Sequence, residues 1–186
     1  MILGALACAA PARADVAPAK AVPVPTQAPP PAAPAQPDPV LLAVGSPAPA
    51  FVATAHTGEK VDLAKLKGKN VVLYFYPKDD TPGCTKEACD LRDNWAKLQA
   101  AGVVVFGVST QDNTSHKAFS EKHKLPFPLL PDEKGELAQK YAVPVVNGKA
   151  KRITYLIGKD GKIKYVWPKV NPVGHAAEIL AQVAAK

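Results

Sequence analysis

The spacing of apolar residues predicts a chain in which strands and helices alternate. Two continuous apolar runs, Val71–Tyr76 and Val103–Val108, have the length and side chains of strands that are buried on both faces. Between the two runs, apolar residues recur at helical spacing, at Ala88, Leu91, Trp95 and Leu98. A strand, a helix and a second strand in this order form a βαβ unit, which implies parallel strands and a right-handed crossover.

The residues on either side of this unit predict the rest of the domain. A small hairpin is expected around His56-Thr57-Gly58, and Asp160-Gly161 is a strong signal for a tight turn between strands 153–157 and 162–167. Helices are expected over residues 113–124 and 134–141, and a last helix has an apolar face made of Ala176, Ile179, Leu180 and Val183. This order of elements predicts an α/β fold with a mixed central sheet flanked by helices.

The first 42 residues differ in composition from the remainder. Twelve of the 20 prolines lie in the first 50 of the 186 residues, and from Val16 to Val40 the chain is nearly all Ala, Pro and Val. Proline removes backbone donors and favours extended conformations, so such a stretch behaves as a semi-stiff spacer. We expect a signal peptide over residues 1–14, a disordered linker rich in Ala and Pro over residues 15–42, and one folded domain over residues 43–186.

The expectation of export depends on a short apolar run, Ile2–Ala10, which is followed by small residues at Ala12 and Ala14. Cleavage after Ala14 would release the domain into the periplasm and remove Cys8. Lipidation of Cys8 is the second alternative, and a retained cytosolic extension is the third. No run approaches the roughly 20 apolar residues that a membrane span needs.

The net charge of the chain is +7, and the first 46 residues contribute none of it. A basic domain can bind nucleic acid or an anionic membrane. In this chain the lysines are interspersed with acidic residues, and no run of basic residues is longer than two. The charge pattern therefore favours a solvated lysine-rich surface, and no nucleic-acid partner is expected.

The segment from Tyr76 to Cys89 carries the candidate chemistry. It lies between the first buried strand and the helix that follows, so Cys84 falls near a helix N-terminus at the C-terminal edge of the parallel strands, where ligand sites gather. Thr81 is expected to be the N-cap of the helix and Pro82 its first residue. Unpaired N–H groups and the positive end of the helix dipole favour a thiolate, which is the nucleophilic form of cysteine.

Cys89 is five residues beyond Cys84, too far for a disulfide on an intact helix. Helical geometry puts the two Cα atoms about 8.6 Å apart, whereas a disulfide needs about 6.8 Å or less. Either the two cysteines never bond, or the first turns of the helix unwind and the redox state switches the local fold. Exchange enzymes of the thioredoxin type would have a Cys-x-x-Cys pair, which this chain lacks.

The pattern Pro77-x-x-x-Thr81-x-x-Cys84, with Arg152 at the start of a later strand, resembles the peroxiredoxins. The run Cys84-Thr-Lys-Glu-Ala-Cys89 is similar to the Q-type, or bacterioferritin-comigratory, subfamily, and the resemblance covers about residues 43–184. It implies a thioredoxin fold and a thiol peroxidase that reduces hydrogen peroxide and organic hydroperoxides. It also implies that Cys84 is the peroxidatic cysteine, that Cys89 is the resolving one, and that Thr81 and Arg152 belong to the site.

The resemblance further implies two partners: a hydroperoxide substrate, and a thioredoxin-like dithiol that reduces the Cys84–Cys89 disulfide. No cofactor or metal is expected, and the protein is expected to be a monomer. Arg152 would offer fixed charged donors to the thiolate and the peroxide, and the Thr81 hydroxyl would bond to a peroxide oxygen. Pro77 would shield the sulfur from water, or simply end the strand.

Two other functions stay open from the residues alone. A disulfide oxidoreductase acting on proteins would share the fold but would have a closer cysteine pair. A non-enzymatic binding or holdase domain would need none of Cys84, Thr81 and Arg152, yet the chain has all three.

Other polar residues are expected to have no role in the reaction. The four histidines do not recur at metal-ligand spacing and are expected to be structural or solvated: His56, His116, His123 and His175. Asp79-Asp80 is expected to be a solvated loop, and Glu87 is expected either to hold the start of the helix or to be exposed.

Overall fold

The computed structural model describes residues 40–185, so the expected signal peptide and most of the expected linker lie outside the described residues. In chain order the elements are β1 (Val52–Thr54), β2 (Lys60–Asp62), the 3-10 helix η1 (Leu63–Leu66), β3 (Asn70–Phe75), α1 (Pro82–Asp93), α2 (Trp95–Ala100), β4 (Val103–Ser109), α3 (Asn113–His123), β5 (Leu129–Pro131), α4 (Glu136–Lys140), β6 (Val145–Val146), β7 (Lys149–Ala150), β8 (Ile153–Ile157), β9 (Ile163–Trp167) and α5 (His175–Ala184). No helix within this part of the chain is both long and apolar enough to cross a bilayer.

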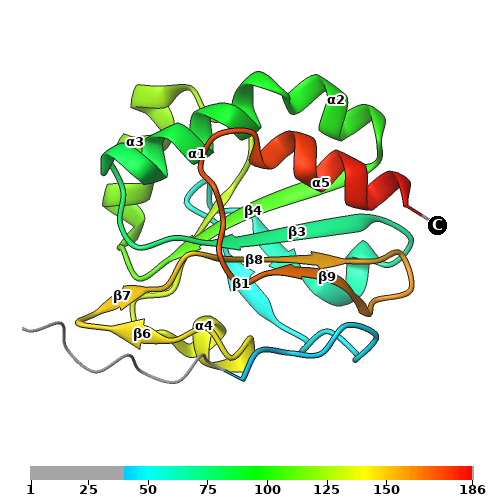
Figure 1. The fold of residues 1–186 in the computed structure, drawn as a ribbon. Coiled ribbons are helices and arrows are strands. Elements are labelled where there is room, and N and C mark those ends of the chain that lie inside the picture. Colours follow the sequence, from blue (N-terminus) through cyan, green and yellow to red (C-terminus); the bar gives the residue numbers. More distant parts are fainter. Residues whose placement is uncertain (1–39, 186) are drawn as a thin grey trace, which may run out of the picture. The chain divides into compact units, whose positions relative to one another are not determined.

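The central sheet has five strands in the order β5-β4-β3-β8-β9 (Figure 1). Strands β3, β4 and β5 are parallel, and β8 and β9 run antiparallel to their neighbours. The expected mixed sheet and the expected βαβ unit are therefore confirmed. The antiparallel pairing of β8 with β3 brings the start of β8 to the end of β3, because Phe75 pairs with Ile153.

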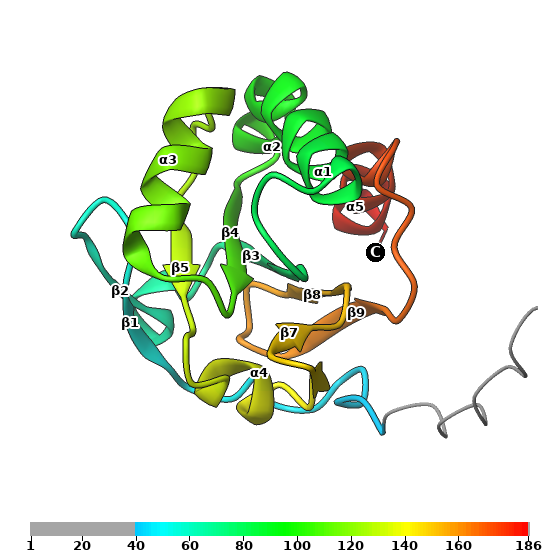
Figure 2. The same cartoon turned by 90° about the vertical axis from the view of Figure 1, so that its left-hand side faces the viewer.

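Side chains of β3 alternate between two hydrophobic cores, one on each face of the sheet. Val71, Leu73 and Phe75 point into a core that is closed by η1, α4 and the hairpin of β1 and β2. Val72 and Tyr74, with Tyr76 directly after the strand, point into the other core, which is covered by α1, α2, α3 and α5 (Figure 2). All six residues of β3 are buried, as expected for a strand covered on both faces.

The structure also contains elements that the sequence pattern did not predict. The third parallel strand, β5, has only three residues and ends in a proline, so it gives no periodic signal. The helix expected to run through Trp95 is broken at Asn94, which ends α1 and precedes α2. Leu41 and Leu42, at the end of the expected linker, are partly buried against the core that contains Val71, Leu73 and Phe75.

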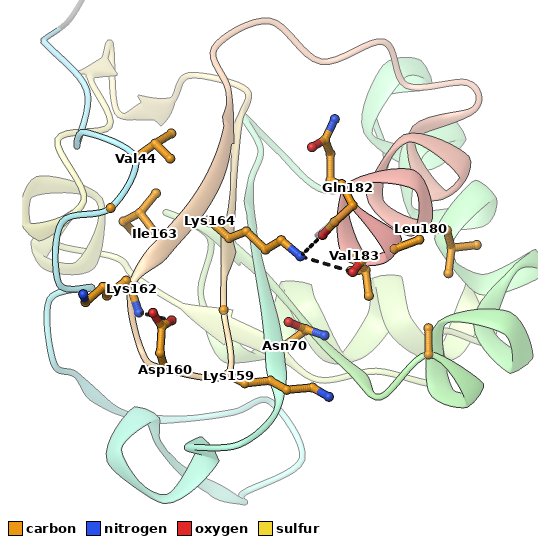
Figure 3. Close-up of a pocket in the computed structure, with 15 residues that line it drawn as sticks. Val44, Asn70, Lys159, Asp160, Lys162, Ile163, Lys164, Leu180, Gln182 and Val183 are labelled. Carbon is orange, nitrogen blue, oxygen red and sulfur yellow. Dashed lines mark hydrogen bonds between the residues drawn. The ribbon is translucent and has the colours of Figure 1, made fainter.

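A cavity of about 900 Å³ lies at the sheet edge opposite the end of β3, between the start of that strand and the C-terminal end of α5 (Figure 3). Lys164 reaches across it, and its Nζ donates to the carbonyl oxygens of Val183 at 3.2 Å and Ala185 at 2.8 Å. A lysine in this place satisfies carbonyls that have no partner within the helix. The Lys164 ammonium group thus caps the C-terminal end of α5.

Candidate active site

The loop after β3 places Cys84 in the first turn of α1. Thr81 has an extended backbone with φ −82° and ψ 147°, and Pro82 is the first helical residue, as the sequence predicted. The Thr81 side chain differs from the expectation, because its hydroxyl does not cap the helix but donates to the Lys78 carbonyl at 3.0 Å. That carbonyl belongs to the loop before the helix, so the Thr81 hydroxyl uses its proton within this loop. The lone pairs of the hydroxyl oxygen take no part in this bond.

Arg152 reaches Cys84 although it lies far away in the sequence. It directly precedes β8, and the register of β8 on β3 puts this position beside the loop that leads into α1. Its Nη2 donates to the Cys84 Sγ at 3.1 Å. A guanidinium beside the sulfur and the free N–H groups of the first helical turn make the surroundings of Cys84 electropositive.

Glu87 completes this cluster, and the sequence reasoning missed its part. One turn after Cys84, its side chain is fully buried and its Oε2 accepts a hydrogen bond from Arg152 Nη1. Within residues 40–185 its second oxygen, Oε1, has no hydrogen-bond partner. Glu87 therefore neither holds the start of the helix nor is exposed. The signal was its helical spacing of three from Cys84, with an arginine expected nearby.

Burial and charge act in opposite directions on this ion pair. Burial is the main cause that raises the pKa of Glu87 to about 7, against the lowering effect of the Arg152 charge and hydrogen bond. Burial also acts to lower the pKa of Arg152, but the charges of Glu87 and Cys84 outweigh it and raise that pKa above its ordinary value. Arg152 thus stays charged at every physiological pH, and the charge on Glu87 changes near neutrality.

The sulfur is closely surrounded. Cys84 is 1% exposed and belongs to the core under α1. A Cβ added at Gly83 would lie 3.2 Å from Arg152 Nη2, closer than side chains normally approach. The missing side chain at Gly83 therefore allows the guanidinium to lie against the first turn of α1.

Cys89 lies further along the same helix, and the helix is unbroken between the two cysteines. Both thiols are free, and Cys89 is half-buried. The structure thus has the wound helix in which the sequence geometry excludes a disulfide.

Asp79 and Asp80 fasten the loop before α1 to α3, which corrects the expectation of a solvated loop. Asp79 is buried and accepts from Tyr76 Oη at 2.7 Å and Ser115 Oγ at 2.6 Å, and its Oδ2 lies 2.9 Å from His116 Nδ1. Burial opposes ionisation of this carboxyl, but the hydrogen bonds from His116 and Ser115 outweigh it and lower the pKa of Asp79.

Asp80 makes a second, exposed attachment of the loop to α3. It is exposed, and its Oδ1 lies 2.9 Å from both Lys122 Nζ and His123 Nε2. Hydrogen bonds from these two residues lower the pKa of Asp80. The loop from Pro77 to Thr81 therefore has a buried and an exposed anchor on one helix.

Pro77 is half-buried at the start of this loop. A cavity of about 670 Å³ is lined in part by Arg152. Its lining is apolar at Leu41, Ile153, Pro168 and Val170, and it includes the exposed side chains of Lys151 and Lys169.

Within the described range no group of three or more His, Cys, Asp and Glu side chains is arranged to hold a metal ion.

Of the residues selected from the sequence, the structure brings Cys84 and Arg152 into direct contact. Thr81 and Pro77 lie in the loop that leads to the helix, and Cys89 lies more than one turn away from Cys84. Glu87 joins the first two from the helix itself.

Comparisons with known proteins agree with this arrangement. Residues 44–166 match the AhpC/TSA family. The chain is 46% identical over 147 residues to a Coxiella burnetii protein named peroxiredoxin bcp, a match that covers 75% of this chain and 97% of the relative. It is 43% identical over 139 residues to the chloroplastic peroxiredoxin Q of Suaeda salsa, covering 73% of this chain but only 65% of that longer protein.

Solved structures give the same result for the fold. Peroxidoxin BcpB from Mycobacterium tuberculosis is 32% identical with a TM-score of 0.70, and the match covers 75% of this chain and 95% of that one. Peroxiredoxin Q from Xanthomonas campestris is 32% identical with a TM-score of 0.67, covering 78% and 96%. The thioredoxin fold of peroxiredoxins is thus confirmed, and the chain belongs to the AhpC/TSA family, among its peroxiredoxins of the Bcp and Q type.

Proposed function

We propose that the protein is a thiol-dependent peroxidase in which Cys84 attacks hydroperoxides and Cys89 resolves the product. The observation that carries the proposal is the contact of 3.1 Å between Arg152 Nη2 and the Cys84 Sγ at the N-terminus of α1. A thiolate is the nucleophile in this chemistry, and this is the kind of electropositive surrounding in which cysteines become reactive. Membership in the peroxiredoxin family supports the same reaction.

In the first step the Cys84 thiolate attacks the distal oxygen of ROOH. The O–O bond breaks, the sulfur becomes a sulfenic acid, and the leaving alkoxide takes up a proton and departs as ROH. Negative charge develops on the leaving oxygen, so donors that are already in place stabilise the transition state. Arg152 supplies such donors, and the backbone N–H groups of Gly83 and Cys84 add to them because they have no partner within the helix.

In the second step the Cys89 thiol attacks the sulfenic sulfur, and a disulfide forms with release of water. The wound helix keeps the two residues too far apart, so part of α1 has to unwind. A thioredoxin-like dithiol then reduces the disulfide by exchange and is itself oxidised, which returns both cysteines to thiols.

The substrates we propose are hydrogen peroxide and organic hydroperoxides. The apolar part of the cavity beside Arg152 supports the second class, because Arg152 both lines this cavity and contacts the sulfur, so we place the alkyl group there. A Xanthomonas campestris bacterioferritin comigratory protein, 32% identical to this chain with a TM-score of 0.67, was solved in a study of alkyl peroxide reduction.

The proposal is tested by adding a stoichiometric amount of hydrogen peroxide and counting free thiols. The wild-type protein should lose the thiols of Cys84 and Cys89 rapidly. Cys89→Ser should lose the Cys84 thiol and give a sulfenic acid that dimedone traps. Cys84→Ser is the matched control because it keeps one thiol on the same helix, and it should lose none at that rate.

Other outcomes point to the other functions. Slow reaction with peroxide but fast exchange with protein disulfides would indicate a disulfide oxidoreductase. No fast reaction with either would indicate a binding or holdase domain. A Cys84→Ser variant with full peroxidase turnover would remove Cys84 from the mechanism.

We also propose that the protein is exported to the periplasm and acts as a monomer. The apolar run Ile2–Ala10 and the small residues at Ala12 and Ala14 support export, and the reductant would then be a dithiol of that compartment. Mass spectrometry of the mature N-terminus tests this: Asp15 as first residue supports periplasmic release, and a lipidated Cys8 or an intact Met1 contradicts it. Sedimentation velocity of the reduced and oxidised protein tests the monomer.

A further inference from the structure

One helix end near the active site is capped by a residue of another helix. Helix α5 begins at His175, and its N-cap residue, Gly174, has φ 85° and no side chain to bond the first N–H groups. The side chain of Asp90, in α1, caps α5 in its place. Its Oδ1 accepts from the Gly174 N–H at 3.2 Å, and its Oδ2 accepts from the Ala176 N–H at 2.8 Å. An acidic side chain suits this position because it also meets the positive end of the helix dipole.

Asp90 is the residue directly after Cys89, so its position is tied to the position of the resolving thiol. Helices α1 and α5 lie side by side (Figures 1 and 2), and Ala88 and Leu91 share a hydrophobic core with Ala176 and Ile179. Any movement that carries Cys89 towards Cys84 therefore pulls Asp90 away from the start of α5.

The segment between the two cysteines is held at both ends. Before Cys84, the loop is attached to α3 through the buried carboxylate of Asp79, which has three side-chain partners. After Cys89, Asp90 is attached to α5 by two backbone N–H groups. The attachment through Asp90 has fewer bonds, is only half-buried and is adjacent to Cys89, one of the two thiols that have to approach each other.

We propose that Asp90 is a positioning residue for the resolution step: it holds Cys89 in the wound helix by capping α5, and disulfide formation withdraws it. The oxidised protein then has an uncapped α5. The inference deepens the proposed peroxidase function and depends on it. Its consequence is that the strength of this cap sets how long the Cys84 sulfenic acid persists before Cys89 reaches it.

The first experiment separates the two chemical steps by stopped-flow mixing of reduced protein with hydrogen peroxide. Asp90→Ala removes the cap, so the first-order formation of the disulfide should become about three- to tenfold faster, as expected for the loss of one capping interaction. The preceding phase, whose rate is proportional to peroxide, should change less than about twofold because Asp90 does not touch Cys84 or Arg152.

Asp93→Ala is the matched control. Asp93 is an exposed aspartate on the same helix, and its carboxylate bonds only its neighbour Arg92 within the described residues. Both phases should be unchanged in this variant. Asp90→Asn serves as the conservative variant, since its amide oxygen can accept one of the two N–H bonds, and its disulfide formation should be intermediate.

The second experiment measures amide hydrogen exchange of Ala176 in the reduced and the oxidised state. In the wild type, exchange should be slow in the reduced protein and faster after oxidation. In Asp90→Ala it should be fast in both states. At high peroxide, faster resolution should also lower the fraction of Cys84 that reaches sulfinic acid in each turnover by the same factor.

Failure of this inference is distinguishable from failure of the proposed function. If the wild type lacks the peroxide-dependent phase, the peroxidase proposal is wrong. If that phase is present but Asp90→Ala and Asp90→Asn form the disulfide at the wild-type rate, Asp90 does not control resolution. Equal protection of the Ala176 amide in both redox states of the wild type would show that the cap is never withdrawn.

Discussion

At the scale of single residues, the candidate site consists of three side chains that modify one another. Arg152 lies between Cys84 and Glu87 and donates a hydrogen bond to each, from Nη2 to the Cys84 Sγ and from Nη1 to the Glu87 Oε2. When Glu87 is ionised, its negative charge offsets part of the positive potential that the guanidinium exerts at the sulfur. When Glu87 is neutral, this offset is absent. Because the pKa of Glu87 is raised to about 7, this balance changes near neutral pH.

Glu87→Gln should change how stability depends on pH. A carboxyl group whose pKa is raised by burial stabilises the fold below its unfolded pKa, and this contribution is lost as pH rises through the folded value near 7. Between pH 4.5 and 7 the wild type should therefore lose roughly 3 kcal/mol of unfolding free energy relative to Glu87→Gln, as an upper figure. Denaturant unfolding of both reduced proteins at several pH values measures the difference, and parallel curves would refute it.

Gly83→Ala should reduce activity without reducing stability. The new methyl group would lie 3.2 Å from Arg152 Nη2, so the guanidinium has to shift by a few tenths of an ångström and its contact with the sulfur is disturbed. Alanine is a better helix former than glycine, so the melting temperature should be unchanged or higher. The second-order rate constant with hydrogen peroxide should fall about tenfold, as expected for losing one charge-assisted contact. An unchanged rate constant would mean that the Arg152 contact has no influence on the reaction.

At the scale of elements, β3 and α1 show what a sequence pattern can and cannot predict. The strands over residues 71–76 and 103–108 and the hairpin at Asp160-Gly161 were predictable because apolar runs and turn residues are local signals. The break at Asn94 and the short strand β5 were not, because tertiary contacts decide them. The N-terminus of α1 at Thr81-Pro82 was predictable, and the direction of the Thr81 hydroxyl was not.

The candidate site divides in the same way. Cys84 and Arg152 could be selected from motif and spacing, and the pairing of β8 with β3 then brings them together. The burial of Asp79 and Glu87 could not be foreseen, since a charged residue is expected to be exposed until its partners are known. In both cases the partner belongs to a distant element, α3 for Asp79 and the start of β8 for Glu87.

Strand β4 contains a glycine for which packing allows no substitute. A Cβ at Gly107 would lie 2.6 Å from both Tyr74 Oη and Leu129 Cδ2. Gly107→Ala should therefore lower the unfolding free energy by roughly 1–3 kcal/mol through overpacking. Val104→Ala on the same strand is the control for a half-buried position and should cost less. Urea unfolding measures both, and equal losses would contradict the packing argument.

At the scale of the whole molecule, the described fold contains two cores and the candidate site within residues 40–185. The family match over residues 44–166 covers the same part of the chain. The role of the segment before residue 40 is therefore a separate question from the chemistry of the domain.

Two truncations test where the folded domain begins. Deletion of residues 1–39 should leave the melting temperature of the reduced protein and its rate with hydrogen peroxide unchanged. Deletion of residues 1–42 also removes Leu41 and Leu42, which are partly buried against the core, and should lower the unfolding free energy by about 1–2 kcal/mol. Equal stability of the two truncated proteins would place the start of the domain after residue 42.

The pairing of β8 with β3 has a consequence for the order of events during synthesis. Cys84 leaves the ribosome 68 residues before Arg152. Strand β3 can pair with its antiparallel neighbour only after β8 has been synthesised. A nascent chain that stops short of β8 exposes an ordinary cysteine without its guanidinium. Under the proposed function, reactivity towards peroxide would arise only when the second half of the domain has folded, and an unfinished chain would be spared oxidation at the proposed peroxidatic cysteine.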